Sequence, residues 1–150
     1  MDHAKRAREL FLQGYNCAQS VFGAFTDVTG LDQDTAMKLA SSFGGGMGRM
    51  REVCGACSGI FMTAGFLFGG YDPNDRAAKA AHYAKIQELA KRFREKNGSI
   101  ICRELLKGAE TSPVPEGRSG GYYKKRPCAD YVEDAAAILD AMLKENAAEK

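Results

Sequence analysis

The sequence predicts an all-α protein, folded as a single-domain helical bundle of about six or seven helices. Apolar residues recur at helical spacing along most of the chain, and no stretch sustains the alternation typical of a strand. Residues 53–69 are apolar on every side and rich in glycine, as expected of a helix at the centre of a bundle. The 150 residues suit one domain, 1–150, with a sizeable core.

Capping residues divide the first half of the chain into four predicted helices. Asp2 caps a helix that continues to Gln13, and Asn16, with a capping box to Gln19, begins a second that ends at Gly30. The third follows position 32 and continues to 43, and the fourth is the central 53–69 helix.

The second half predicts three helices and one long loop. The longest helix is 76–96, stopped by Asn97-Gly98, and a short helix over 100–107 follows the cap Ser99. Residues 108–127 lack periodicity, and a loop of this length is typically functional or mobile. The last helix extends from Cys128 to about position 146. The residues expected to face the core are Ala7, Leu10, Phe11, Ala18, Val21, Phe22, Phe25, Ala36, Leu39, Ala40, Phe43, Ile86, Leu89, Ala90, Phe93, Val132, Ala135, Leu139, Met142 and Leu143.

Charge and hydropathy exclude several classes of function. The 21 basic and 19 acidic residues give a net charge of +2, which implies no strong field for nucleic acid or an anionic membrane. The charged start of the chain is not a signal peptide, so we expect a cytoplasmic protein. Residues 53–69 are at the short limit for crossing a bilayer, and we expect a buried helix there instead of a membrane span.

The five cysteines are the candidate reactive groups. An odd number without an export signal argues against a disulfide scaffold and favours buried thiols, metal ligands or redox groups. His3 and His82 lie far apart, so a zinc site of mixed cysteine and histidine ligands is poorly supplied.

Four cysteines fall at the starts of four predicted helices: Cys17, Cys54, Cys102 and Cys128. Free backbone N–H groups and the helix dipole stabilise negative charge there, which lowers a thiol's pKa and improves it as a nucleophile and metal ligand. If the four starts converge, the site suits an iron–sulfur centre or a tetrathiolate metal site. The alternative is that each cysteine only fills the core.

These cysteine motifs resemble a family of small proteins named C_GCAxxG_C_C. Residues 54–59 read as its CGAxxG motif, residues 16–19 resemble its first cysteine motif, and 43–49 resemble its glycine run. Cys102 within 99–106 and Cys128 resemble the third and fourth cysteine positions. The resemblance covers almost the whole chain in order.

The resemblance implies an all-helical, redox-active protein of bacteria or archaea, without an established substrate. Related domains accompany haem in some multidomain redox proteins, where an iron–sulfur cluster is implied. Cys57 fills a variable position of the motif. It can be a disulfide partner of Cys54, a substitute ligand, or a replacement for a small apolar residue, and we expect the last. The single CxxC that it forms lacks the βαβ pattern of a thioredoxin.

The glycine run at 44–48 is a second candidate feature. It lacks the ending of a phosphate-binding loop and follows no predicted strand, so we expect a tight turn that brings Cys54 against other backbone. Arg49 and Arg51 beside it are expected to be solvated, with pairing to anionic sulfur as the alternative. The candidate cofactor-binding glycines are Gly45, Gly46, Gly48 and Gly55.

The sequence leaves the partners open. Tyr122-Tyr123-Lys124-Lys125-Arg126 can cover the site or dock an acidic electron carrier, although a solvated loop is the simpler expectation. The redox partner is not identified, and the apolar central helix is compatible with a homodimer.

The leading interpretation is a redox protein in which Cys17, Cys54, Cys102 and Cys128 form the active constellation, with Cys57 accessory. An iron–sulfur or other metal-thiolate centre for electron transfer comes first. A metal-free dithiol/disulfide oxidoreductase is the alternative within the same class. The alternative from another class is a structural zinc protein or a non-catalytic helical interaction module.

Overall fold

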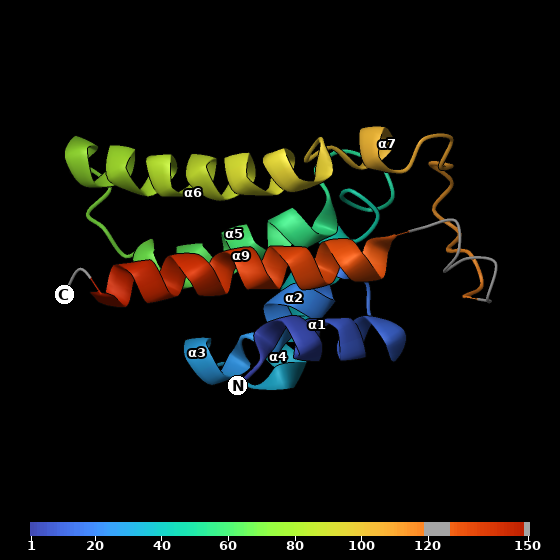
Figure 1. Cartoon of the computed structure of the whole chain (residues 1–150), viewed down its shortest axis with the longest axis horizontal. Coiled ribbons are helices and arrows are strands. Elements are labelled where there is room, and N and C mark those ends of the chain that lie inside the picture. The colour runs from blue at the N-terminus through green and yellow to red at the C-terminus, as the bar shows by residue number, and fades with distance from the viewer. Residues whose placement is uncertain (119–126, 149–150) are drawn as a thin grey trace.

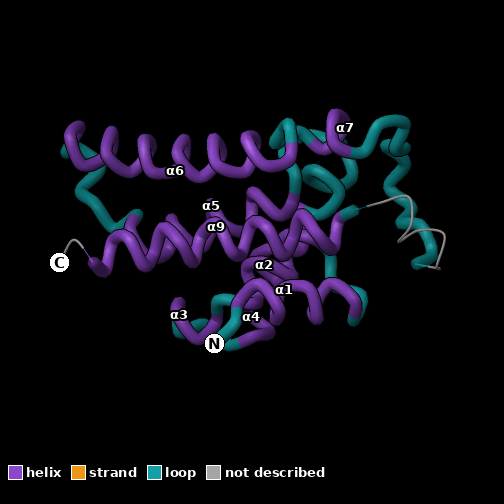
Figure 2. Tube along the Cα trace, viewed as in Figure 1, coloured by secondary structure: helices purple, strands orange, loops and turns teal. Residues whose placement is uncertain are grey.

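The computed structural model describes residues 1–118 and 127–148, and these form an all-helical protein (Figure 1). Their eight α-helices are α1 (His3–Leu12), α2 (Cys17–Ala24), α3 (Thr26–Thr29), α4 (Gln33–Ala40), α5 (Gly55–Phe68), α6 (Arg76–Asn97), α7 (Cys102–Leu105) and α9 (Cys128–Ala148). A 3-10 turn, η1 (Ser41–Phe43), follows α4. The described part contains no strand (Figure 2), and its single β-bridge joins Val53 to Ile101.

The helices pack around α9. This last helix contacts α1, α2, α5 and α6, and the long helices α6 and α9 lie along the long axis of the molecule (Figure 1). The shorter helices α1 to α4 gather on the side of α9 opposite α6. The starts of α5, α7 and α9 lie toward the same end of the molecule, where the chain also forms a loop after α7.

The predicted caps are present except at the short helix, where Ile101 and not Ser99 is the cap residue of α7. The side chains of Asp2, Asp32 and Asp75 each accept a hydrogen bond from a backbone N–H in the first turn of their helix. Asn16 and Gln19 form the reciprocal capping box of α2. Gly98 ends α6 in the left-handed conformation. Most of the predicted helix starts lie within two residues of the observed ones.

Three details of the prediction are wrong. The second helix stops at Ala24, because the N–H of Phe25 bonds to the carbonyl of Phe22 and a separate turn, α3, leads to Gly30. The short helix over 100–107 shrinks to α7, because Ile101 is engaged in the bridge to Val53. Leu39 is 54% exposed, since Ala36, Met37 and Ala40 form the buried face of α4.

The apolar helix α5 is buried over only part of its length. Its first six residues, Gly55 to Ile60, are all buried between neighbouring helices, whereas Phe66 is 52% exposed. No helix of the described chain combines the length and the apolar character needed to cross a bilayer.

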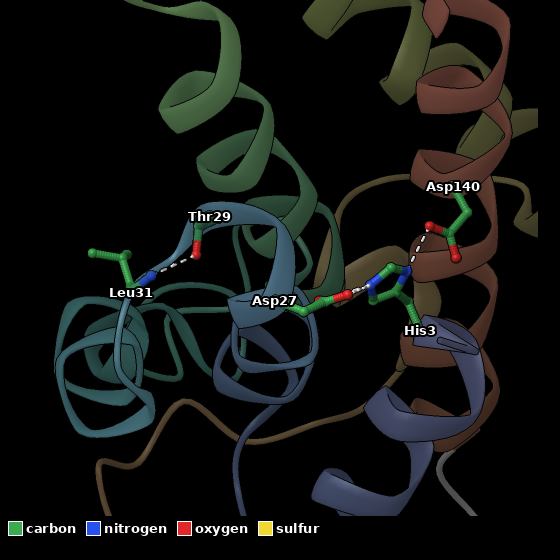
Figure 3. A network of polar contacts seen from close by, with 5 residues as sticks. All are labelled: His3, Asp27, Thr29, Leu31 and Asp140. Carbon is green, nitrogen blue, oxygen red and sulfur yellow. Dashed lines mark hydrogen bonds and ion pairs between the residues drawn. The ribbon is translucent and has the colours of Figure 1, made fainter.

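His3 joins three helices from a nearly buried position (Figure 3). Its Nδ1 lies 2.7 Å from Asp140 of α9, and its Nε2 lies 2.9 Å from Asp27 of α3. The ring also stacks on Phe25, with 4.2 Å between centroids. The contact ties α1 to α3 and α9.

Replacing His3 by alanine is expected to destabilise the protein by about 1–3 kcal/mol, because two partly buried carboxylates lose their donor. Urea unfolding followed by circular dichroism measures the change. Arg8→Ala is the matched control on the same helix: it removes two exposed ion pairs, to Asp130 and Glu133, and should cost at most about 1 kcal/mol. Equal losses in the two variants would contradict the role given to His3.

Candidate functional site

Four cysteines line one cavity of about 70 Å³. Cys17, Cys102 and Cys128 are the first residues of α2, α7 and α9, and Cys54 is the cap of α5. Cys54, Cys102 and Cys128 are each 5% exposed, and Cys17 is half-buried. All five cysteines of the chain are free thiols.

Two short backbone segments place Cys54 beside Cys102. The N–H of Cys54 bonds to the carbonyl of Ile100 at 2.7 Å, and the N–H of Cys102 bonds to the carbonyl of Glu52 at 2.6 Å. The β-bridge between Val53 and Ile101 lies between these bonds. Thus backbone pairing places two cysteines side by side that are 48 positions apart in the chain.

The glycine run forms the tight turn that the sequence predicts. Every residue from Gly45 to Arg49 has a positive φ, and Arg51 also has a positive φ, of 62°. Glycine adopts this conformation freely, but each non-glycine residue in it costs about 1–2 kcal/mol. Three such residues, Met47, Arg49 and Arg51, therefore store strain next to the cavity.

Two glycines allow backbone to approach the cysteines. A Cβ atom on Gly46 would lie 2.6 Å from the Cβ of Cys102 and 2.7 Å from the backbone nitrogen of Glu52. A Cβ atom on Gly55 would lie 3.0 Å from the Cβ of Cys17. A side chain at either position would push a cysteine away from the cavity.

Arg51 is buried against a thiol. It is 4% exposed, its Nη1 lies 3.7 Å from the Sγ of Cys102, and its Nε donates to the carbonyl of Glu110 at 2.9 Å. The expectation of a solvated arginine is therefore wrong for Arg51. The pairing of its backbone carbonyl with the N–H of Arg103 holds the residue inward.

The position of the cysteines at helix starts predicts a lowered pKa for every one of the four thiols. The structure supports this for Cys54 but not for all of them. The pKa of Cys54 is lowered by a hydrogen bond from the Cys57 thiol and by the N–H groups of Ala56 and Cys57, which outweigh its burial.

The pKa values of two other cavity cysteines are raised instead. For Cys17 the causes are its hydrogen bond with the Cys128 thiol and its burial. For Cys102 burial outweighs the nearby Arg51. The prediction of a lowered pKa is thus wrong for Cys17 and Cys102, because they lie in a desolvated site among other thiols.

The sequence analysis did not predict which other residues line the cavity. Phe11, Leu106 and Tyr131 make its apolar wall, and Arg118 reaches it from the long loop. The guanidinium of Arg118 lies 4.2 Å from the centroid of the Phe11 ring and donates to the carbonyl of Tyr15 at 2.7 Å. Only the unusual length of the 108–127 loop pointed to this contribution.

A larger groove adjoins the cavity. It has a volume of about 430 Å³ and shares Asn16, Gly45, Arg51 and Arg118 with the cavity. Arg49 lines the groove, half-buried, with its Nη1 enclosed and unbonded among the described atoms. The four shared residues place the groove directly beside the thiol cavity.

The remaining candidate residues are distributed as follows. Gly45, Gly46 and Gly55 line the cavity, whereas Gly48 lines only the groove. The 122–126 patch lies outside the described residues. Within residues 1–118 and 127–148, no three or more histidine, cysteine, aspartate or glutamate side chains are arranged to hold a metal ion.

Replacing Gly46 by alanine should destabilise the protein more than replacing Gly48. Both residues have positive φ, so each substitution costs about 1 kcal/mol of backbone strain. Only at Gly46 does the new Cβ meet backbone and Cys102, which adds about 1–3 kcal/mol. Denaturant unfolding of the two variants measures the difference, and equal stabilities would show that the close approach at Gly46 is not needed.

Comparison with known proteins supports the assignment that the motifs suggest. The family model described as "Putative redox-active protein (C_GCAxxG_C_C)" matches residues 15–142, a span that contains all five cysteines and the glycine run. The comparisons found no matching curated protein and no matching solved structure. Because the match covers most of its length, the chain belongs to the C_GCAxxG_C_C family.

Proposed function

We propose that this chain is a cytoplasmic redox protein whose four-cysteine cavity holds an iron–sulfur cluster. Cys17, Cys54, Cys102 and Cys128 would be its ligands. The observation that carries the proposal is that these four thiols, brought from four separate helices, line a single small cavity. Bound there, the cluster would supply one-electron transfer.

The donor set suits a cluster better than a single ion. Zinc bound by four thiolates draws every sulfur to about 2.3 Å from one point. The four thiols line a cavity of about 70 Å³. A cluster of several iron and sulfide atoms occupies the space between its thiolates, which fits a cavity lined by four of them.

Two features of the site favour negative charge on sulfur, against the Cys128 hydrogen bond that raises the pKa of Cys17 and the burial that raises the pKa of Cys102. Arg51 lies against the sulfur of Cys102, and backbone N–H groups face the sulfur of Cys54. The apolar wall of Phe11, Leu106 and Tyr131 limits water. Hydrogen bonds to sulfur and limited solvent access are the means by which proteins set the potential of such centres.

A dithiol/disulfide couple is the second candidate. The Cys17 and Cys128 thiols share a hydrogen bond, so the two sulfurs lie close enough for chemistry between them. In this version two thiols give up two electrons and two protons to form one disulfide. A structural zinc protein or an interaction module is the alternative from another class.

Anaerobic purification with iron and sulfide analysis separates these functions. We expect iron with acid-labile sulfide and visible absorption bands. Serine at position 17, 54, 102 or 128 should reduce the iron content to background. Cys57→Ser is the matched control, because Cys57 does not line the cavity, and it should retain iron.

The other outcomes would reject the cluster. Zinc alone, together with unfolding by a chelator, would indicate a structural site. Absence of metal after reconstitution, with five titratable thiols and a reversible two-electron couple, would leave the dithiol function.

In the metal-free protein, Arg51→Gln should slow alkylation of Cys102 severalfold at pH 8. Arg51 lowers the pKa of Cys102, so its removal raises that pKa and reduces the thiolate fraction at any pH below it. Raising the pH should restore the rate. Mass spectrometry of iodoacetamide-treated protein measures it.

Arg103→Gln is the control for this prediction. Its side chain is 56% exposed, pairs with Glu52 and donates from Nε to the backbone carbonyl of Arg51 at 3.1 Å. The variant therefore removes a neighbouring positive charge and leaves the Arg51 guanidinium in the chain. If both variants slowed alkylation equally, the effect would be a general one of charge and not of the Arg51 contact.

A further inference from the structure

Cys57 is the one cysteine that does not line the cavity. It is fully buried, with 0% exposure, on the side of α5 that packs into the core. The proposed cluster makes no use of it. Its burial agrees with a core-filling role, but its thiol also contacts a reactive group.

That group is the thiol of Cys54. Cys54 caps α5 and Cys57 is the third residue of the helix, so the two side chains project from the same first turn. The Cys57 thiol donates a hydrogen bond to the sulfur of Cys54. Residues three apart in an α-helix have Cα atoms roughly 5 Å apart, and disulfides span Cα separations of about 4.4–6.8 Å. The pair is therefore placed to be joined.

We propose that Cys57 is the resolving thiol of Cys54, so that oxidation joins the two residues in a disulfide and withdraws Cys54 from the cavity. The disulfide itself does not depend on the proposed function. Its consequence does: with one of four ligands removed, the oxidised protein would not hold the cluster.

The two thiols differ in access, and this sets the order of events. Cys54 lines the cavity that adjoins the groove, whereas Cys57 is closed off behind it. A cavity of about 70 Å³ admits only a small oxidant, and hydrogen peroxide is of that size. Of this pair, Cys54 is thus the thiol that peroxide meets first.

The chemistry balances in two steps. The Cys54 thiolate takes the terminal oxygen of hydrogen peroxide, forming a sulfenic acid as the O–O bond breaks and hydroxide leaves. The Cys57 sulfur then attacks the Cys54 sulfur, the S–O bond breaks, and the hydroxyl leaves as water with the thiol proton. Overall two thiols lose two electrons, and one peroxide becomes two waters.

Cys17 and Cys128 form the competing pair, because their thiols also share a hydrogen bond. The two disulfides are readily distinguished. Trypsin leaves Cys54 and Cys57 together in residues 52–76, whereas Cys17 and Cys128 fall in different peptides. A bond within one peptide is therefore separable from a bond between two.

The experiment treats reduced, metal-free protein with one equivalent of hydrogen peroxide, blocks remaining thiols with maleimide, and maps tryptic peptides. We expect two of the five thiols to disappear, with a disulfide inside residues 52–76. Cys57→Ser should instead stop at a Cys54 sulfenic acid that dimedone traps. In Cys54→Ser, Cys57 should remain a thiol.

Two results would overturn the proposal. One is a Cys17–Cys128 disulfide with Cys57 still reduced in the wild-type chain. The other is equal oxidation of Cys57 with and without Cys54. The wild-type map decides even if a variant folds poorly, and Cys57→Ala provides a second variant. Failure of the protein to take up iron would reject the proposed cluster. It would not affect the test of the disulfide, which depends on the peptide map alone.

Discussion

The cavity depends on backbone approaching cysteine side chains without anything between them. Gly46 lies against Cys102 and Gly55 against Cys17, at separations that leave no room for a Cβ atom. Backbone hydrogen bonds from Cys54 to Ile100 and from Cys102 to Glu52 then hold Cys54 and Cys102 beside each other. Because all four thiols come from different helices, any side chain at these two glycines would separate the helix starts. The assembly of the cavity therefore depends first on the absence of side chains at Gly46 and Gly55.

Burial of the thiols disfavours their charged form, and Arg51 in the glycine-rich loop partly offsets this effect. Desolvation raises the pKa of Cys102, and the buried guanidinium of Arg51 opposes it. Arg51 holds this position with a left-handed backbone, at the end of a loop in which Met47 and Arg49 share the strain. Strained non-glycine residues persist where the surrounding structure compels them, and they cluster at functional sites. The strain and the buried charge therefore occur together at the cavity.

The sequence predicted the parts of the fold that local chemistry determines. Helix starts at Asp2, Asn16 and Asp32 follow from caps, which act over one turn. The burial of Arg51 and the arrival of Arg118 could not be read from the chain, because both depend on segments more than 50 residues away. The raised pKa of Cys17 was missed for the same reason: its partner, Cys128, lies at the far end of the sequence.

Cys54 occupies the junction of two sets of thiols. Toward the cavity it faces Cys17, Cys102 and Cys128, and along its own helix it receives the hydrogen bond of Cys57. A thiolate that accepts one S–H and backbone N–H bonds is stabilised before any metal or oxidant arrives. The same sulfur is therefore prepared both to ligate a metal and to be oxidised, and one covalent bond to Cys57 would exclude the other use. A small apolar residue at position 57 would preserve the packing, but Cys54 could then no longer form this disulfide.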